Sequence, residues 1–422
     1  MKNTYIYFQY SPSLRASGEQ DNVKSKVELN AKHKLKNIIF NRQDEKERED
    51  TVVLYAEAFP PDVGGGEKYN FELAKSINLS GIKMVVITPI KSGVPDLQDF
   101  EVVRMKLPLK FGFSLNFIES FILIVQRRPK LIHFSGPAFS DLVLIPILKF
   151  LRRKVVVTFH GQFNNKLARQ IFSIFIRFIY RYVDRIIVET SRDENYLKNL
   201  GVDEHKIRNF IFVGIDSQYL TCESQQTDTL SIKNDRPLKF IFIGGLTSSR
   251  PYKGSDLLID LFIELSKSNI EPIPEISVIG KGDLLPILTR KAEGFTNIHF
   301  FGYLNQEDLL KQLKDSDMLI LPSKSDGEGF GIVALEAIGC GKPVIVSKYA
   351  GISEYILKYN AGYVVDPFNF NEIIEIIKYI NLNRGILNVL RENGRKMITM
   401  EEMTKNGSIR KTLEVYREVI SS

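Results

Sequence analysis

Two glutamates lie eight positions apart in the chain, at 328 and 336, and three glycines lie at alternate positions around the first of them. Gly327, Gly329 and Gly331 let the backbone bend sharply and approach a ligand closely. The residues after Gly331 have helical spacing, and the free amides at a helix start attract an anion such as phosphate. Glu328 and Glu336 would repel phosphate, so we expect their carboxylates to bind hydroxyl groups. Amides for phosphate and acids for sugar hydroxyls together predict a nucleotide-sugar site.

A strand, a loop, a helix and a second strand are expected to position these residues. The apolar run from Met318 to Leu321 has the length of a buried strand. Apolar residues then recur at helical spacing from Ile332 to Ile338, and Gly339 and Gly341 end that helix. The run from Pro343 to Val346 is the second strand. The alternative interpretation is an ordinary crossover with Glu336 in solvent.

The spacing of the two glutamates resembles the Glu-x7-Glu signature of the family 4 retaining glycosyltransferases. The match extends to Gly341-Lys-Pro-Val344 and to Gly351-x-x-Glu354. The resemblance implies a GT-B fold, in which two Rossmann-like domains face an interdomain active site and the last helix often returns to the first domain. It also implies transfer of a sugar, with retention, from a nucleotide-diphosphate sugar to an acceptor hydroxyl in glycan, glycolipid or polysaccharide assembly.

Composition indicates an ordinary globular protein of two domains. The 422 residues are 44% hydrophobic and 25% charged. The net charge of +7 permits anionic partners without selecting one. Cys222 and Cys340 form no metal spacing or disulfide framework, which favours the cytoplasm. No signal-peptide core begins the chain and no apolar stretch has the length of a membrane span, so we expect any membrane contact to be peripheral, at the inner membrane face.

Alternating strand and helix patterns predict an α/β protein with two doubly wound, mostly parallel sheets. The predicted strands are 52–56, 84–88, 100–105, 131–134, 154–159 and 185–189, followed by 239–243, 275–279, 298–301, 318–321 and 343–346. We expect five parts: a polar extension (1–50), an acceptor-side domain (51–220), a linker (221–237), a nucleotide-sugar-binding domain (238–403) and a terminal helix (404–422). Such sheets bind ligands beyond the carboxyl ends of their strands, so facing sheets would share a cleft.

Cations follow the strand 239–243, where they suit a diphosphate leaving group. Lys253 precedes Gly254, as in the Lys-Gly pair of the family, but Gly245 occupies the position of the family arginine. We assign that role to Arg250, which follows in a longer loop. A solvated surface side chain is the alternative for Arg250.

His160 ends the strand 154–159 and precedes a glycine. Its Thr-Phe-His-Gly context resembles that of the family's active-site histidine, which contacts the donor sugar near the reacting carbon. His133 lies within a similar strand, and we expect it to pack in the core, with a place in the cleft as the alternative.

Glycines at two other strand ends complete the predicted site. Gly64 to Gly66 follow the first strand but lack the dinucleotide-binding pattern. The resemblance implies that Gly65 and Gly66 face the donor phosphate and the acceptor. Asp62 and Glu67 lie beside them in the sequence and are candidate acceptor contacts. Gly280 and Gly282 resemble the family loop near the nucleoside. Val213 replaces an asparagine of the family pattern.

We expect His160, Glu328 and Lys253 to be catalytic. Glu328 would hold sugar hydroxyls and Glu336 the ribose, while Gly329, Phe330 and Gly331 would contact the donor. No paired aspartates of the DxD type follow a suitable strand, so we expect no metal. We expect a donor of the UDP or GDP type and no other cofactor.

The apolar run from Lys166 to Tyr182, punctuated by cations, has two interpretations. It is either a core helix or a surface that docks on an anionic bilayer to reach a lipid-linked acceptor. No module for nucleic acid is recognisable. A nucleotide-sugar epimerase, a phosphorylase and a non-catalytic nucleotide-sugar-binding subunit are the functional alternatives, and the sugar, base and acceptor are left open.

Overall fold

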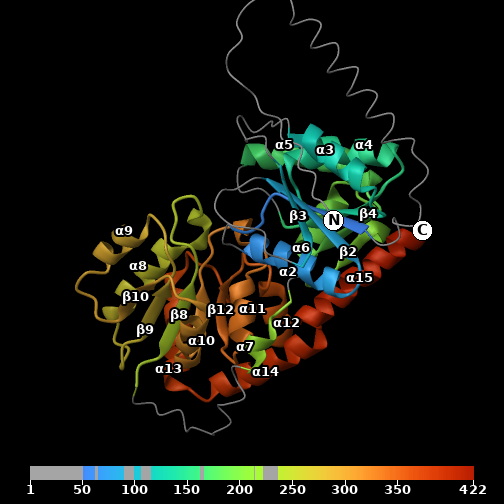
Figure 1. Cartoon of the computed structure of the whole chain (residues 1–422). Coiled ribbons are helices and arrows are strands. Elements are labelled where there is room, and N and C mark those ends of the chain that lie inside the picture. Colours follow the sequence, from blue (N-terminus) through green and yellow to red (C-terminus); the bar gives the residue numbers. More distant parts are fainter. Residues whose placement is uncertain are drawn as a thin grey trace, which may run out of the picture.

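The computed structural model describes residues 51–61, 65–89, 99–105, 116–161, 166–212, 214–221 and 236–422. The predicted extension (1–50), nearly all of the predicted linker, Asp62, Gly64 and Val213 lie outside these residues. Two α/β domains lie side by side, and the last helix runs from one to the other (Figure 1).

The first domain is built on a seven-stranded parallel sheet in the order β3-β2-β1-β4-β5-β6-β7. Its strands are β1 (Thr51–Ala56), β2 (Lys83–Pro89), β3 (Glu101–Met105), β4 (Leu131–Gly136), β5 (Lys154–Phe159), β6 (Arg185–Val188) and β7 (Ile207–Asn209). Its helices are α2 (Gly65–Leu79), α3 (Asn116–Arg127), α4 (Phe139–Phe150), α5 (Lys166–Ile179) and α6 (Ser191–Asn199).

The second domain is built on a six-stranded parallel sheet in the order β10-β9-β8-β11-β12-β13. Its strands are β8 (Lys239–Ile243), β9 (Glu275–Ile279), β10 (Ile298–Gly302), β11 (Met318–Leu321), β12 (Val344–Ser347) and β13 (Gly362–Val365). Its helices are α7 (Ser217–Thr221), α8 (Ser255–Ser266), α9 (Leu285–Lys291), α10 (Gln306–Asp315), α11 (Ile332–Gly339), α12 (Ser353–Tyr359), α13 (Phe370–Leu382) and α14 (Ile386–Met400).

Both sheets follow from the continuous apolar runs of the sequence. A parallel strand covered by helices on both faces has no polar side, and every residue of β1, β11 and β12 is buried. The eleven predicted strands are present, and the α/β class with two parallel-sheet domains is confirmed. The short edge strands β7 and β13 were not predicted.

The chain crosses between the domains at two adjacent points. Ile215 forms an isolated bridge with Thr404, and a Cβ on Gly214 would collide with the backbone of Thr404 and Lys405. Tyr219 already packs in the core of the second domain, so the first crossing lies near Gly214, before the predicted linker.

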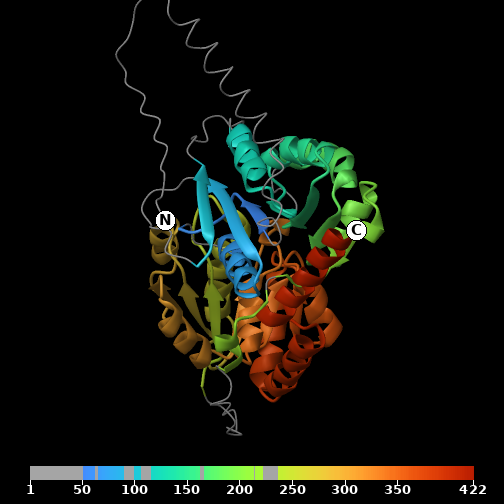
Figure 2. The same ribbon diagram turned by 45° about the vertical axis from the view of Figure 1, so that its right-hand side comes forward.

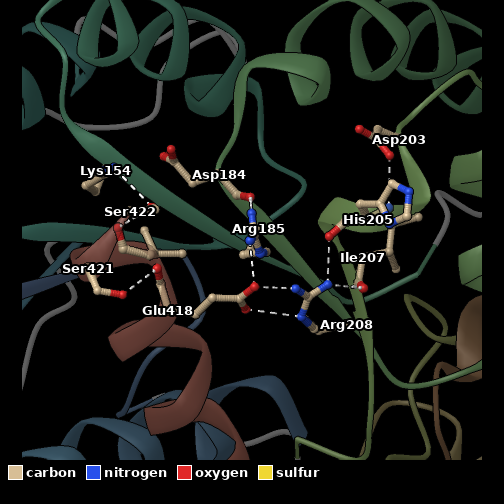
Figure 3. Close-up of polar contacts among 11 residues, drawn as sticks. Lys154, Asp184, Arg185, Asp203, His205, Ile207, Arg208, Glu418, Ser421 and Ser422 are labelled. Atoms are coloured by element: carbon tan, nitrogen blue, oxygen red, sulfur yellow. Dashed lines mark hydrogen bonds and ion pairs between the residues drawn. The ribbon is translucent and has the colours of Figure 1, made fainter.

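The last helix, α15 (Lys405–Ser421), returns to the first domain, as the resemblance implied (Figure 2). Val415, Tyr416 and Val419 pack in the core of the first domain. Glu418 accepts hydrogen bonds from the guanidinium groups of Arg185 and Arg208 (Figure 3). Apolar packing and paired charges therefore fasten α15 to the first domain.

Among the described residues, no helix has both the length and the apolar character needed to cross a membrane.

Candidate active site

A cleft of about 660 Å³ lies between the two domains and is lined by residues of both. Loops from the carboxyl ends of the strands form it, as the parallel topology requires. Ten predicted site residues line it: Gly65, Gly66, His160, Arg250, Lys253, Glu328, Gly329, Phe330, Gly331 and Glu336.

Glu328 ends the short turn η5 (Asp326–Glu328), between β11 and α11. Its side chain is only 4% exposed, and its carboxylate accepts hydrogen bonds from Lys253 Nζ at 2.7 Å and from Ser323 Oγ at 3.0 Å. A buried carboxylate needs such partners, because removing a charge from water without pairing is costly. The predicted catalytic carboxylate and the predicted phosphate-binding lysine therefore form an ion pair.

The turn that carries Lys253 is fastened to the end of β11. Lys253 ends the turn η4 (Pro251–Lys253), and the next residue, Gly254, has a φ of 70°. A Cβ on Gly254 would collide with the carbonyl oxygen of Pro322, and the Lys324 amide donates to Tyr252 O at 2.7 Å. Arg250 immediately precedes η4 and lines the cleft.

Glu336 lies half-buried in the first turns of α11 and meets a cation from the other domain. Lys68 Nζ, in the first turns of α2, donates to Glu336 Oε1 at 2.7 Å. The two helix starts approach closely, since a Cβ on Gly65 would lie 3.2 Å from Ile332 Cδ1. Glu336 also contributes, after burial, to a raised pKa of Tyr219. Two helix starts, with their free amides, therefore converge on the cleft.

The lining of the cleft also includes residues that the sequence pattern did not predict there, namely Lys68, Tyr69, Tyr252 and Glu189. Lys68 lies two positions after Gly66, and Glu189 follows the last residue of β6. Their proximity to predicted strand ends was the available signal. Proximity to a strand end does not show which side of the first turn of α2 faces the second domain, because tertiary packing sets that side. This signal alone was therefore too weak to identify Lys68.

His160 follows β5 and is held from three sides. Its Nε2 lies 2.6 Å from Ser135 Oγ, and its ring packs edge-on against Tyr69 and Phe212, with centroids 5.2 and 5.1 Å away. This burial lowers the pKa of His160 to about 4, although part of the side chain faces the cleft. The imidazole is therefore neutral at physiological pH and can exchange hydrogen bonds without carrying charge.

His133 is fully buried in β4 and does not line the cleft, in agreement with the packing role expected for it. Its ring nitrogens lie 2.6 Å from Tyr416 Oη and 2.6 Å from Thr158 Oγ1. Thr158 Oγ1 in turn lies 3.2 Å from Tyr69 Oη. Burial, and then the nearby His160, lower the pKa of His133 to about 3. This buried chain connects α15 to the tyrosine that packs against His160.

Gly280 and Gly282 do not line the cleft. Their φ angles are 151° and 157°, and a Cβ on either would collide with the carbonyl oxygen of Gly244 or Leu246, respectively. Glycine is therefore required there by the close approach of the loop after β8. Contact with a nucleoside remains a prediction for both.

No group of three or more histidine, cysteine, aspartate or glutamate side chains within the described ranges is arranged to hold a metal ion.

Two family models match the chain in succession. The model described as "Glycosyltransferase Family 4" matches residues 63–217, and "Glycosyl transferases group 1" matches residues 226–397. The chain is 30% identical over 323 residues to the D-rhamnosyltransferase WbpZ of Pseudomonas aeruginosa. The aligned region covers 72% of this chain and 79% of that relative.

Solved structures agree in fold. A glycosyltransferase from Rickettsia africae superposes with a TM-score of 0.69 at 22% identity, covering 88% of this chain and 99% of that one. HepE of Anabaena, solved in complex with UDP, superposes with a TM-score of 0.69 at 16% identity, covering 88% of this chain and 100% of that one. At these identities the likeness establishes the two-domain architecture.

Proposed function

Since this chain belongs to glycosyltransferase family 4 and is a sugar transferase, we propose that it moves the sugar of a nucleoside diphosphate sugar to an acceptor hydroxyl. The donor would be held in the interdomain cleft, and transfer would retain the anomeric configuration of the sugar. The observation that carries the proposal is the pairing of Lys253 with Glu328 and of Lys68 with Glu336 in one cleft. Each pair combines a group suited to phosphate with a group suited to hydroxyls.

Donor binding would replace the partners of Lys253 and Glu328. The lysine would turn to the diphosphate, together with Arg250 and the amides at the start of α11, and the carboxylate would accept hydrogen bonds from sugar hydroxyls. Negative charge grows on the departing phosphate, and fixed positive groups stabilise it most in the transition state.

Glu336 and His160 would hold the two ends of the donor. Glu336 would accept hydrogen bonds from the ribose. The neutral His160, oriented by Ser135, would bond a sugar hydroxyl near the reacting carbon. Gly65 and Gly66 line the cleft from the first domain, and the acceptor would enter there beside the diphosphate.

We expect transfer without a divalent metal, because Lys253, Arg250 and the start of α11 can together supply the positive potential at the diphosphate. The check is turnover in excess EDTA. Retained turnover agrees with this expectation, whereas a loss that Mg²⁺ or Mn²⁺ restores contradicts it.

A panel of UDP, GDP and ADP sugars in a thermal-shift assay tests the donor class. A ligand that binds only the folded state raises the melting temperature by mass action. UDP is the first candidate, since HepE was solved with it, and GDP the second. The stabilising nucleotide should lose its effect in Glu336→Ala. No shift with any donor would contradict the proposal.

Product analysis distinguishes transfer from the alternatives. Release of the nucleoside diphosphate should require an acceptor, and NMR should show the anomeric configuration of the donor sugar in the product. Acceptor-independent release of nucleotide would instead support an epimerase. An inverted product would overturn retention alone.

We propose further that the first domain docks on the inner membrane face to reach a lipid-linked acceptor. Helices α3, α4 and α5 gather at the end of this domain away from the second (Figure 1). They and the following turn expose Ile118, Ile122, Ile147, Phe150, Ile174, Phe175, Phe178 and Tyr182. Arg181 lies over the Phe178 ring at 5.6 Å, and Arg177 lies in the last turn of α5, so cations accompany the apolar side chains. Apolar side chains with cations suit an anionic bilayer.

Sedimentation with phosphatidylglycerol vesicles against phosphatidylcholine vesicles tests this docking. The wild-type protein should sediment with the anionic vesicles, and Phe175→Ser/Phe178→Ser should sediment less. Equal and negligible sedimentation of the wild-type protein with both would contradict it.

A further inference from the structure

Arg192 reaches from the first domain to the loop that carries Glu328. It lies in the first turn of α6, and its Nη1 donates to Asp326 Oδ1 at 2.9 Å and to the main-chain oxygen of Tyr349 at 2.8 Å. Asp326 begins the turn η5, which ends at Glu328. One half-buried guanidinium of the first domain thus holds the second domain two residues from its catalytic carboxylate.

The two segments that Arg192 holds are also bonded to each other. The Gly351 amide donates to Gly329 O at 2.7 Å, and the Ile352 amide donates to Phe330 O at 2.8 Å. Gly329 and Phe330 line the cleft directly after Glu328. Displacement of either segment would therefore displace the other, together with the wall of the donor site.

Neighbouring residues extend this contact between the domains. The Ser191 amide donates to Glu354 Oε2 at 3.0 Å, and Tyr355 Oη donates to Glu189 O at 3.2 Å. The Tyr355 ring packs edge-on against Phe330, with centroids 5.9 Å apart. Residues 189–192 of the first domain and 349–355 of the second therefore form one junction behind the Glu328 loop.

We propose that Arg192 is a positioning residue that fixes Glu328 in its reactive place when the two domains meet. This inference rests on the proposed function, because it assigns Glu328 to the donor sugar. Arg192 acts through Asp326 and Tyr349 and touches no reacting atom. A guanidinium that bonds two acceptors fixes the geometry of the loop better than a single point charge does. Its loss matters because a displacement of about 1 Å in a reacting group can cost up to about 100-fold in rate.

The first test separates turnover from donor binding. Arg192→Met should lower kcat at least about tenfold and leave the donor KM within about twofold, since the interaction lost is one that the transition state needs. Arg192→Lys should recover part of kcat. Asp326→Asn added to Arg192→Met should cost nothing more, because the two residues act as one unit.

The matched control is Arg236→Met. Arg236 forms a two-bonded ion pair with Asp317, at 2.8 and 2.6 Å, but neither residue lines the cleft. This variant should keep wild-type kcat and KM. An unchanged kcat in Arg192→Met, or additive losses in the double variant, would overturn the proposal.

Hydrogen exchange of residues 322–332 gives a readout independent of turnover. With the nucleoside diphosphate bound, this segment should exchange faster in Arg192→Met than in the wild-type protein and in Arg236→Met. Equal exchange would contradict the role of Arg192. A wild-type protein without acceptor-dependent transfer would contradict the proposed function instead, and the exchange comparison would still decide whether Arg192 positions the loop.

Discussion

At the scale of single residues, oppositely charged side chains of the cleft pair with one another. Lys253 pairs with Glu328 within the second domain, and Lys68 pairs with Glu336 across the cleft. Pairing with Lys253 limits the cost of keeping Glu328 buried. We propose that a donor substitutes its phosphates and hydroxyls for these partners, so that the groups that pair in the cleft also bind the substrate.

Glu328→Gln tests the role of this carboxylate. The amide keeps the shape and can still accept from Ser323, but it loses the charge that strengthens hydrogen bonds from sugar hydroxyls. We expect kcat to fall about 100-fold, a magnitude typical of losing one stabilising group at a reacting centre, in an assay of acceptor-dependent nucleotide release. Glu375→Gln, which changes a side chain that is 70% exposed on α13, should have no effect. Wild-type turnover in Glu328→Gln would remove this residue from the mechanism.

The pH dependence of kcat/KM tests the state of His160. Burial lowers its pKa to about 4, so the imidazole stays neutral as the pH falls from 8 to 5 and protonates only near 4. We expect the profile of the wild-type enzyme between pH 5 and 8 to match that of His160→Asn in shape, at a higher level. A wild-type inflection near pH 6.5 that disappears in the variant would show that a protonating His160 takes part.

At the scale of elements, single glycines decide how the site loops pack. Gly254 ends the turn of Lys253 against Pro322, and Gly331 precedes α11 with a φ of 88°. The sequence pattern located both loops, because glycines after buried strands are a strong local signal. It could not reveal that Gly280 and Gly282 pack against the loop after β8. The carbonyl oxygens with which a Cβ at either position would collide belong to residues more than thirty positions away.

Gly254→Ala should reduce both stability and turnover. An alanine with a φ of 70° costs about 1–2 kcal/mol, and its Cβ would also push the Lys253 turn away from β11. Gly294→Ala is the matched control, because Gly294 has a φ of 89° but no atom within 4 Å of a Cβ. We expect denaturant unfolding to show a larger loss for Gly254→Ala and kinetics to show a fall in kcat for that variant alone. Equal effects of the two variants on turnover would contradict this account of the loop.

The elements themselves were largely predictable. Long buried runs such as β5 and β8 were identified to the residue, because strands covered on both faces leave an apolar signature. The edge strands β7 and β13 have three and four residues and only partial burial, so no periodicity marks them. The position of the cleft could be predicted from the strand ends. The contacts of Lys68 and Arg192 could not be predicted, because each forms only where the two domains pack together.

At the scale of the whole molecule, the last helix connects the second domain back to the first. The crossing near Gly214 and the return of α15 run together between the domains, and α15 is fastened by Tyr416 inside and by Glu418 at its end. Tyr416 also belongs to the buried chain that reaches Tyr69 beside His160. The last helix therefore supports the candidate active site through this chain.

Tyr416→Phe should destabilise the protein more than its size suggests. It leaves a nitrogen of the buried His133 without its partner, which costs about 1–3 kcal/mol. Tyr379→Phe, at a side chain that is 50% exposed, should change the unfolding free energy little. Equal unfolding midpoints for Tyr416→Phe and the wild-type protein would show that the bond between α15 and β4 contributes nothing to stability.

A crystal structure with the nucleoside diphosphate that most stabilises the protein would test whether the interdomain cleft holds the donor. We expect the ribose at Glu336, the terminal phosphate within hydrogen-bonding distance of Lys253 and of the amides from Gly329 to Gly331, and both lysines released from their glutamates. A nucleotide bound outside the interdomain cleft, or one bound there while Lys253 still pairs with Glu328, would contradict it.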